Sequence, residues 1–163
     1  MKTKGFRFFV YGFIVLLSLL LLEFCRRNVG SFAGAYPFAE KWEIDYSIEE
    51  VEAALKELQQ SDPAIFFQKD SLVLKPDIFA FNKRVDFYYA DRHEIVHTFI
   101  RGFGNNTHLT LISFNDTQSG VLRLMNRDFN FFANEKEKQI FKTRIIGPIY
   151  KILNKGSLVK SVN

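Results

Sequence analysis

The chain has 163 residues, which is room for one folded domain of ordinary size beside any targeting segment. Its formal net charge of +4 arises within residues 1–30, where five basic side chains face one acidic one, whereas 17 basic and 17 acidic residues balance from Ser31 onward. That balance excludes nucleic-acid binding, because contact with phosphates uses a broad positive field.

The N-terminal segment is an apolar stretch between basic flanks. Phe8 to Leu22 contains fifteen residues without a charge. As a helix this run is about 22 Å long, and its apolar neighbours extend it toward the ~30 Å hydrocarbon core of a bilayer. We therefore expect residues 1–27 to form an uncleaved signal-anchor, a single-pass membrane helix in contact with lipid.

Two alternatives to an uncleaved anchor stay open. A secretory signal has a similar apolar run, but the nearest small-x-small cleavage site, Ala33-Gly34-Ala35, lies well past it. Cys25 follows the run as a lipidated cysteine does, although Phe24 stands where bacterial lipoproteins place a small residue. Basic residues slightly favour the N-terminal flank, so the positive-inside bias predicts an extracytoplasmic soluble domain.

The soluble part begins with a linker and a helix. Residues 28–40 are rich in Gly, Ala and Ser and predict a flexible linker to a soluble domain at residues 41–155. Ser47 and Glu50 form a capping box, in which each side chain can bond a backbone amide of the other residue. Ser61-Asp62-Pro63 ends the helix. Its apolar stripe consists of Ile48, Val51, Leu55 and Leu58.

Several β-rich segments follow this helix. Residues 64–81 hold short apolar runs split by polar residues, which predict edge strands or loops. Four segments separated by turn residues then predict an antiparallel meander, at residues 85–90, 94–101, 107–114 and 121–125.

The last predicted element is a helix from about Asn134 to Leu153. Gly147-Pro148 inside it predicts a kink, or two helices with Pro148 in the first turn of the second. Residues 156–163 are expected to be a disordered tail. The sequence therefore predicts an α+β fold, in which an N-terminal and a C-terminal helix pack on the apolar face of the sheet.

One short motif carries the sharpest chemical hypothesis. His93-Glu94-Ile95-Val96-His97 has zinc-protease spacing, and over these five residues the chain resembles the zincins. On a helix, His93 and His97 would lie about 6 Å apart on one face as zinc ligands, with Glu94 as the base that activates water. In a strand their Cα atoms would be roughly 13 Å apart, too far to share one ion.

Two patterns compete over this segment. The spacing of apolar residues between Tyr88 and Phe103 favours a helix. Residues 95–100 are mostly β-branched, and the GFGNN hairpin loop that follows leads into an alternating segment, which favours a strand. We expect the strand, with His93, His97 and His108 as partly exposed sheet residues.

A third zinc ligand is also not evident from the motif. The positions that metzincins fill with Gly and His hold Ile100 and Phe103 here. Carboxylates that would substitute for the missing ligand are Asp116, Glu135 and Glu137. With a strand as the expected backbone, we assign no catalytic, metal-binding or cofactor-binding residue.

No other catalytic motif stands out, since the chain has no Gly-rich phosphate loop, no nucleophile elbow and no second cysteine. We expect a non-enzymatic binding or protein-interaction module of the cell envelope, with a protein partner on the exposed sheet face. A membrane-tethered zinc metalloprotease using His93-Glu94-x-x-His97 is the alternative. A carrier of hydrophobic ligands is a third hypothesis, motivated by the 19 phenylalanines.

Overall fold

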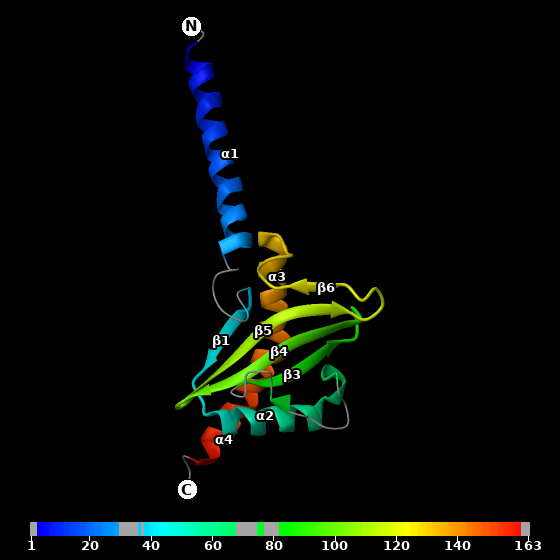
Figure 1. Cartoon of the computed structure of the whole chain (residues 1–163). Helices are drawn as coiled ribbons and strands as arrows, with labels where there is room; N and C mark the ends of the chain where they lie inside the picture. Colours follow the sequence, from blue (N-terminus) through cyan, green and yellow to red (C-terminus); the bar gives the residue numbers. More distant parts are fainter. Residues whose placement is uncertain (1–2, 30–35, 37, 68–74, 77–81, 161–163) are drawn as a thin grey trace.

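The computed structural model describes residues 3–29, 36, 38–67, 75–76 and 82–160, and it confirms the α+β class. Along the chain, its elements are α1 (Thr3–Val29), β1 (Glu40–Ile44), α2 (Ile48–Ser61), a 3-10 turn (Pro63–Ile65), β2 (Lys75–Pro76), β3 (Lys83–Tyr89), β4 (Glu94–Phe103), β5 (Asn106–Asp116), β6 (Leu122–Leu124), α3 (Phe131–Phe141), a π turn (Lys142–Ile146) and α4 (Gly147–Lys160) (Figure 1).

One antiparallel sheet contains all six strands, in the order β1-β5-β4-β3-β2, with β6 also on β5. The predicted meander is confirmed as β3 to β6. The sequence analysis did not predict β1, whose five residues straddle the expected boundary between linker and domain. β1 pairs with the first part of β5, where Glu40 faces Leu111 and Ile44 faces Thr107, and β6 pairs with the last part.

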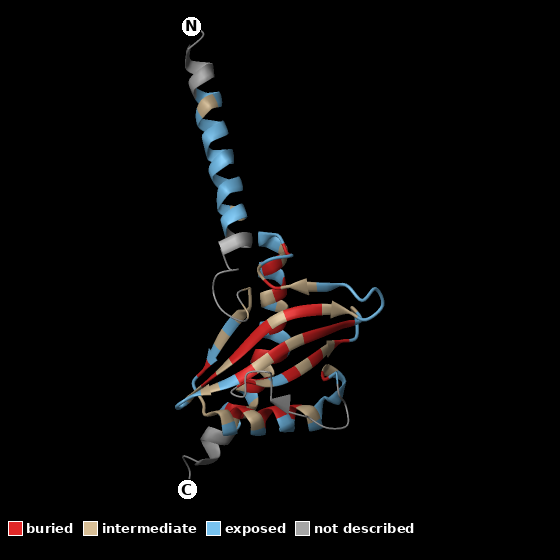
Figure 2. Cartoon of the chain, viewed as in Figure 1, coloured by how far each residue is buried: buried red, intermediate tan, exposed pale blue. Residues whose placement is uncertain are grey.

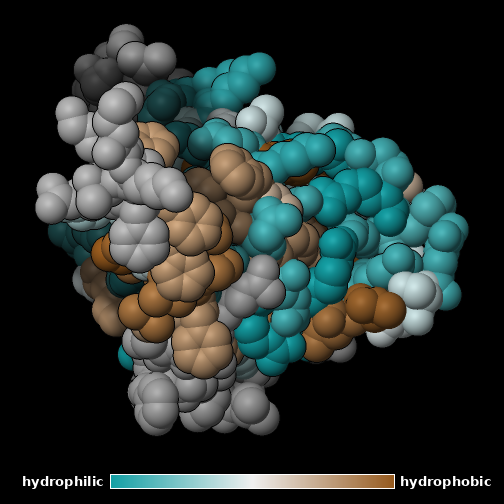
Figure 3. Space-filling model, turned by 90° about the horizontal axis from the view of Figure 1, so that it is seen from above, coloured by the Kyte–Doolittle hydropathy of each residue, from teal (hydrophilic) through white to brown (hydrophobic). Residues whose placement is uncertain are grey.

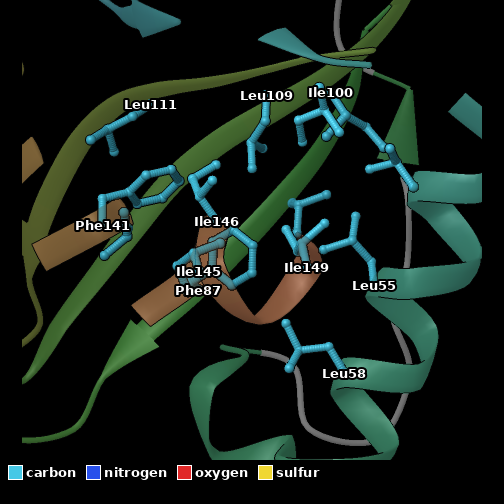
Figure 4. Close-up of a cluster of buried hydrophobic side chains, with 14 of the residues drawn as sticks. Leu55, Leu58, Phe87, Ile100, Leu109, Leu111, Phe141, Ile145, Ile146 and Ile149 are labelled. Carbon is cyan, nitrogen blue, oxygen red and sulfur yellow. The ribbon is translucent and has the colours of Figure 1, made fainter. Parts of the chain in front are cut away.

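The hydrophobic core lies between one face of this sheet and the helices α2 and α4 (Figures 1 and 4). The predicted Ser47–Glu50 capping box is present at the start of α2. The apolar stripe of α2 packs against the C-terminal helices. Buried side chains are confined mostly to this layer (Figure 2). The cluster includes Leu55, Leu58, Phe87, Ile100, Leu109, Phe141, Ile145 and Ile149.

The C-terminal helical region differs from its prediction in one detail. It begins at Phe131, three residues early, with the Asn130 side chain accepting a hydrogen bond from the amide of Ala133. The chain then stays helical through the π turn, where the Gly147 amide bonds the Lys142 carbonyl, five residues back. This wider turn accommodates Pro148 in the first turn of α4, since proline has no amide to donate.

The boundaries at the two ends also differ from expectation. α1 continues to Val29, past the predicted anchor, and α4 continues to Lys160, five residues into the segment predicted as a tail. Gly156 did not interrupt the helix because isolated glycines weaken α-helices without ending them. The sequence analysis expected short apolar runs between residues 64 and 81. Two of these runs, at residues 72–74 and 78–81, lie outside the described residues.

α1 is long and apolar enough to cross a membrane. Its 27 residues correspond to about 40 Å of helix, and the window Phe8–Cys25 has a mean hydropathy of 2.4 with none of it buried against the domain. It extends away from the sheet and helices, with its described side chains exposed along most of its length (Figure 2). The part of the chain that the structure describes contains one such helix.

Candidate functional site on the open face of the sheet

The His93-Glu94-x-x-His97 segment contains the predicted strand from Glu94 onward, whereas His93 lies in the turn before it. His93 is the last residue of the turn, with φ +53°, and β4 begins at Glu94. Side chains alternate along a strand, so Glu94 and His97 point to opposite faces. Glu94 lies opposite Tyr89 on the helix-covered face, and His97 lies opposite Asp86 on the other face.

This backbone does not fit a zinc ion at the motif. The helix that would bring His93, Glu94 and His97 to one side is not formed, so the metalloprotease alternative loses the geometry on which it depends. Among the described residues, no three His, Cys, Asp or Glu side chains are grouped as a metal site.

The carboxylates considered as a third zinc ligand each have another role. Asp116 accepts hydrogen bonds from the amides of Gln118 and Ser119 in the β5–β6 turn. Glu135 pairs with Lys138 along α3, at 3.2 Å. Glu137 is buried, and it pairs with an arginine of the β3–β4 turn that also contacts Glu94.

That arginine, Arg92, is the centre of a buried ionic cluster. It donates to both carboxylate oxygens of Glu137, at 2.6 and 2.9 Å, and its Nη2 lies 2.8 Å from Glu94 Oε2. Arg123 of β6 contacts the other oxygen of Glu94. Burial by itself would lower the pKa of Arg92, but Glu137 and Glu94 outweigh it and raise that pKa. Two carboxylates and two guanidiniums therefore join β4, β6 and α3.

This cluster occupies the Glu94 carboxylate. Its side chain is 5% exposed and paired with two guanidiniums, so it faces away from solvent and from both histidines of the motif. The Tyr89 hydroxyl lies in the same layer, and burial raises its pKa above the ordinary value for tyrosine. The covered face therefore uses its polar groups to hold elements together.

The opposite face of the sheet presents a different polar group, centred on His97. His97 Nδ1 lies 2.9 Å from Asp86 Oδ1 and 2.7 Å from Arg84 Nη2, and Arg84 Nε lies 3.0 Å from both Asp86 oxygens. The register also places Ser113 of β5 directly opposite His97, on the side away from Asp86. We call this surface, formed by Arg84, Asp86, His97, Phe99 and Ser113, the His97 face.

One ring nitrogen cannot serve both of its neighbours at once. With its proton on Nδ1, His97 donates to Asp86; with Nδ1 unprotonated, it accepts from Arg84. Burial alone would raise the pKa of the Asp86 carboxyl, but its hydrogen bonds with His97 and Arg84 and their charges hold that pKa below its ordinary value. Asp86 therefore stays a carboxylate, available to orient the imidazole.

A pocket of about 250 Å³ opens beside His97. A β-bulge forms part of its wall. The register between β4 and β5 shifts between His97 and Thr98, so that Ile112 of β5 has no residue opposite it on β4. Ile112 and Ser113 both line the pocket. Tyr36 stacks against Phe99, with ring centroids 5.1 Å apart, as an aromatic side of the same pocket.

A second hollow, of about 580 Å³, lies between β3 and the C-terminal helices. Its lining includes Asp91 and Arg144, which form an ion pair with contacts of 2.6 and 2.8 Å. Both hollows are open to solvent and have charged side chains among their lining, so neither is the closed apolar cavity that a carrier of hydrophobic ligands would use.

The sequence analysis named His97 but not the residues that surround it. Arg84 and Asp86 alternate with the core residues of β3, a period-two signal that places both on one face. Which residue lies opposite His97 depends on the register of the β3–β4 turn, and that register is not encoded in a local pattern. His108 is half-buried against Phe103, as expected for a partly exposed sheet residue, whereas His93, also expected in the sheet, is an exposed residue of the β3–β4 turn.

No protein-family model matches the chain, and comparison with curated proteins finds no match in sequence. The function therefore has to be argued from the geometry of the His97 face and from α1.

Proposed function

We propose that the protein is a membrane-tethered, non-enzymatic binding module of the cell envelope, which presents the His97 face to a partner protein. The observation that carries this proposal is the pocket beside His97, which lies on the face of the sheet that α2 and α4 leave free. Its aromatic wall, Tyr36 and Phe99, and its arginine, Arg84, are the types of side chain that dominate the binding energy of protein interfaces.

The chemistry of the pocket defines the group that it accepts. At about 250 Å³ it is smaller than a typical pocket for a drug-sized ligand, and it suits one inserted side chain. Tyr36 and Phe99 offer apolar contact, while Arg84 and His97 offer hydrogen-bond donors. The expected occupant is an apolar side chain that carries a carboxylate, a carbonyl or another acceptor, presented by a loop of the partner.

Photo-crosslinking in native membranes tests this proposal. A photo-reactive amino acid at Phe99 should give a discrete adduct, which Arg84→Ala should abolish. The matched control places the same reagent at Lys56, an exposed residue of α2 on the opposite side of the core. Equal adducts from positions 99 and 56, or an adduct at 99 that survives Arg84→Ala, would argue against a partner on the His97 face.

The location of the domain is part of the same proposal. We place α1 as an uncleaved single-pass signal-anchor with the domain on the extracytoplasmic side, because basic residues slightly favour its N-terminal flank. An alkaline phosphatase fused after Asn163 should be active, and a cytoplasmic fluorescent reporter fused there should be dark. The reverse pattern would place the domain in the cytoplasm.

A second candidate function is acyl transfer, which one observation favours. Asp86, His97 and Ser113 follow one another across β3, β4 and β5 in direct register, the order of groups in a nucleophile-base-carboxylate triad. Ser113 is 3% exposed and sits in a strand bulge, however, and Arg84 competes for the ring nitrogen that Asp86 would hold. Labelling of Ser113 by a fluorophosphonate would establish this function, and its absence would favour the binding module.

A further inference from the structure

α3 exposes aromatic residues and buries polar ones. Phe131 and Phe132, in its first turn, are 54% and 82% exposed, whereas Asn134 and Glu137 are buried. Soluble helices ordinarily do the reverse, which makes an exposed aromatic pair informative. The two rings contact each other edge to face, with centroids 5.6 Å apart.

The inward side of α3 explains why this aromatic pair stays outside. The Asn134 side chain accepts a hydrogen bond from the backbone amide of Asn126 and donates one to the Asn126 side-chain oxygen. Glu137 accepts two hydrogen bonds from Arg92. These polar contacts fix the rotation of the helix about its axis. Phe131 and Phe132 therefore cannot turn into the core without breaking a buried ionic cluster.

The chain enters the domain from α1 beside the same turn. The Asn126 side-chain amide donates to the carbonyl of Phe38 and to the carboxylate of Glu40, each at 3.1 Å. Lys138 of α3 pairs with the same carboxylate at 3.0 Å. The start of β1 is thereby fastened to α3 and to the loop before it. In Figure 1, α3 begins at the end of the domain that α1 meets.

The connection from α1 to this point is short. Seven residue steps separate Val29, the last residue of α1, from Tyr36, and they span at most about 25 Å. α1 itself is about 40 Å long, so with the ~30 Å core of a bilayer around it, its ends reach the headgroup layer. The end of the domain that carries Phe131 and Phe132 is thus held close to the membrane.

We propose that this end of the domain rests on the bilayer, with Phe131 and Phe132 inserted among the lipid headgroups and upper acyl chains. The inference rests on α1 as a membrane anchor, and it does not depend on what the His97 pocket binds. Two phenylalanines would bind a bilayer weakly from solution, but tethering makes the contact intramolecular and raises the local concentration of lipid.

The surroundings of the pair favour lipid over a protein partner. Viewed from the α1 side, the part of the domain that neither α1 nor grey atoms cover is mostly hydrophilic, with apolar atoms in small patches (Figure 3). A few apolar anchors in a polar face match the interfacial layer of a membrane, whereas a stable protein interface buries a broad apolar centre. The contact would also fix how the His97 face is oriented relative to the membrane.

Fluorescence quenching in liposomes tests the proposal on the full chain. Phe132→Trp places a reporter at the pair, and bromine-labelled acyl chains quench only indoles that reach the lipid. Phe103→Trp is the matched control. Phe103 is also an exposed phenylalanine, at 46%, but it lies at the tip of the β4–β5 hairpin. This tip follows the Ile44 end of β1, whereas α3 is fastened to the opposite, Glu40 end. Trp42 contributes the same background to both variants.

The proposal expects a blue-shifted, strongly quenched emission from the indole introduced at position 132 and little change from the one at position 103, each relative to the unsubstituted protein. Equal quenching of the two variants would overturn it. A signal at position 132 that fades as protein is diluted with lipid would also overturn it, in favour of a second copy of the chain. Flotation of the protein with the liposomes tests α1 as an anchor separately. Failure to float would contradict both the anchor and the lipid contact of Phe131 and Phe132. Crosslinking at Phe99 tests the proposed partner independently.

Discussion

Glu94 and His97 lie three residues apart on one strand and meet opposite environments. Glu94 is buried beneath the helices between Arg92 and Arg123, whereas His97 faces a pocket on the open side, with Asp86 and Arg84 as neighbours. A two-residue period divides a motif that a helix would have gathered into one site. On the covered face, charged side chains join strands and helices to one another. On the open face, charged side chains are accessible from solvent.

The two faces should also differ in what a lost side chain costs. Removing one member of a buried ion pair leaves an uncompensated charge and costs about 3–5 kcal/mol. Pairs with a solvated member contribute about 0–1 kcal/mol. Arg84 is 51% exposed, so its interactions belong to the second class. Glu94 is buried, but its partners Arg92 and Arg123 are 24% and 37% exposed, so its pairs lie between the two classes.

The largest effect is expected for Glu94→Ala. This change removes the carboxylate shared by Arg92 and Arg123. Arg92 keeps Glu137 and the Arg123 side chain is 37% exposed, so the free energy of unfolding should fall by about 1–3 kcal/mol. Glu135→Ala is the control, since Glu135 also pairs with a cation of α3 but its side chain is 48% exposed, and it should cost less than about 1 kcal/mol. Urea denaturation followed by Trp42 fluorescence measures both. Equal costs would mean that burial does not determine what the loss of an ion-paired carboxylate costs.

His97→Ala should have a smaller effect on stability and a larger one on binding. Asp86 keeps its bond to Arg84 in this variant, so the free energy of unfolding should fall by about 1 kcal/mol or less. The photo-adduct from position 99 should nevertheless disappear. A variant that unfolds more easily than Glu94→Ala, or that binds normally, would contradict a presenting role for His97.

The smallest expected effect is a pH dependence that arises from Asp86. Its pKa is lowered in the folded protein, so its contribution is fully present above the unfolded pKa of about 3.9 and is lost as the pH falls through the lower, folded value. Unfolding free energies of the unsubstituted protein and of Asp86→Asn should therefore differ by less than about 1 kcal/mol at pH 7 and converge as the pH falls below the unfolded pKa of about 3.9. A difference that grows on acidification would have the wrong sign.

Local signals in the sequence were enough to predict most elements. Ser47 and Glu50 mark the start of α2, and alternation with turn residues marks β3 to β6. β1 escaped prediction because its five residues become a strand through pairing with β5, more than sixty residues later. Gly147-Pro148 marked where the C-terminal helix is irregular, but the pair does not specify a π turn rather than a kink.

The sequence analysis assigned no residue to a site. His97 stood out only through its spacing to His93, a relation that the strand makes irrelevant. Its actual neighbours, Asp86, Arg84 and Ser113, come from adjacent strands and are identified only once the register is known. The exposed aromatic pair of α3 was missed because FFANEKEKQI has helical composition, and what fixes its rotation is the distant Arg92.

Histidine footprinting tests most directly whether the His97 face is a binding surface. Acylation of His93 and His97 by diethyl pyrocarbonate would be compared by mass spectrometry between purified protein and native membranes, where a partner is present. We expect His97 to lose reactivity in native membranes while His93, exposed in its turn, reacts equally in both. Equal reactivity of His97 in the two preparations would contradict a partner on this face.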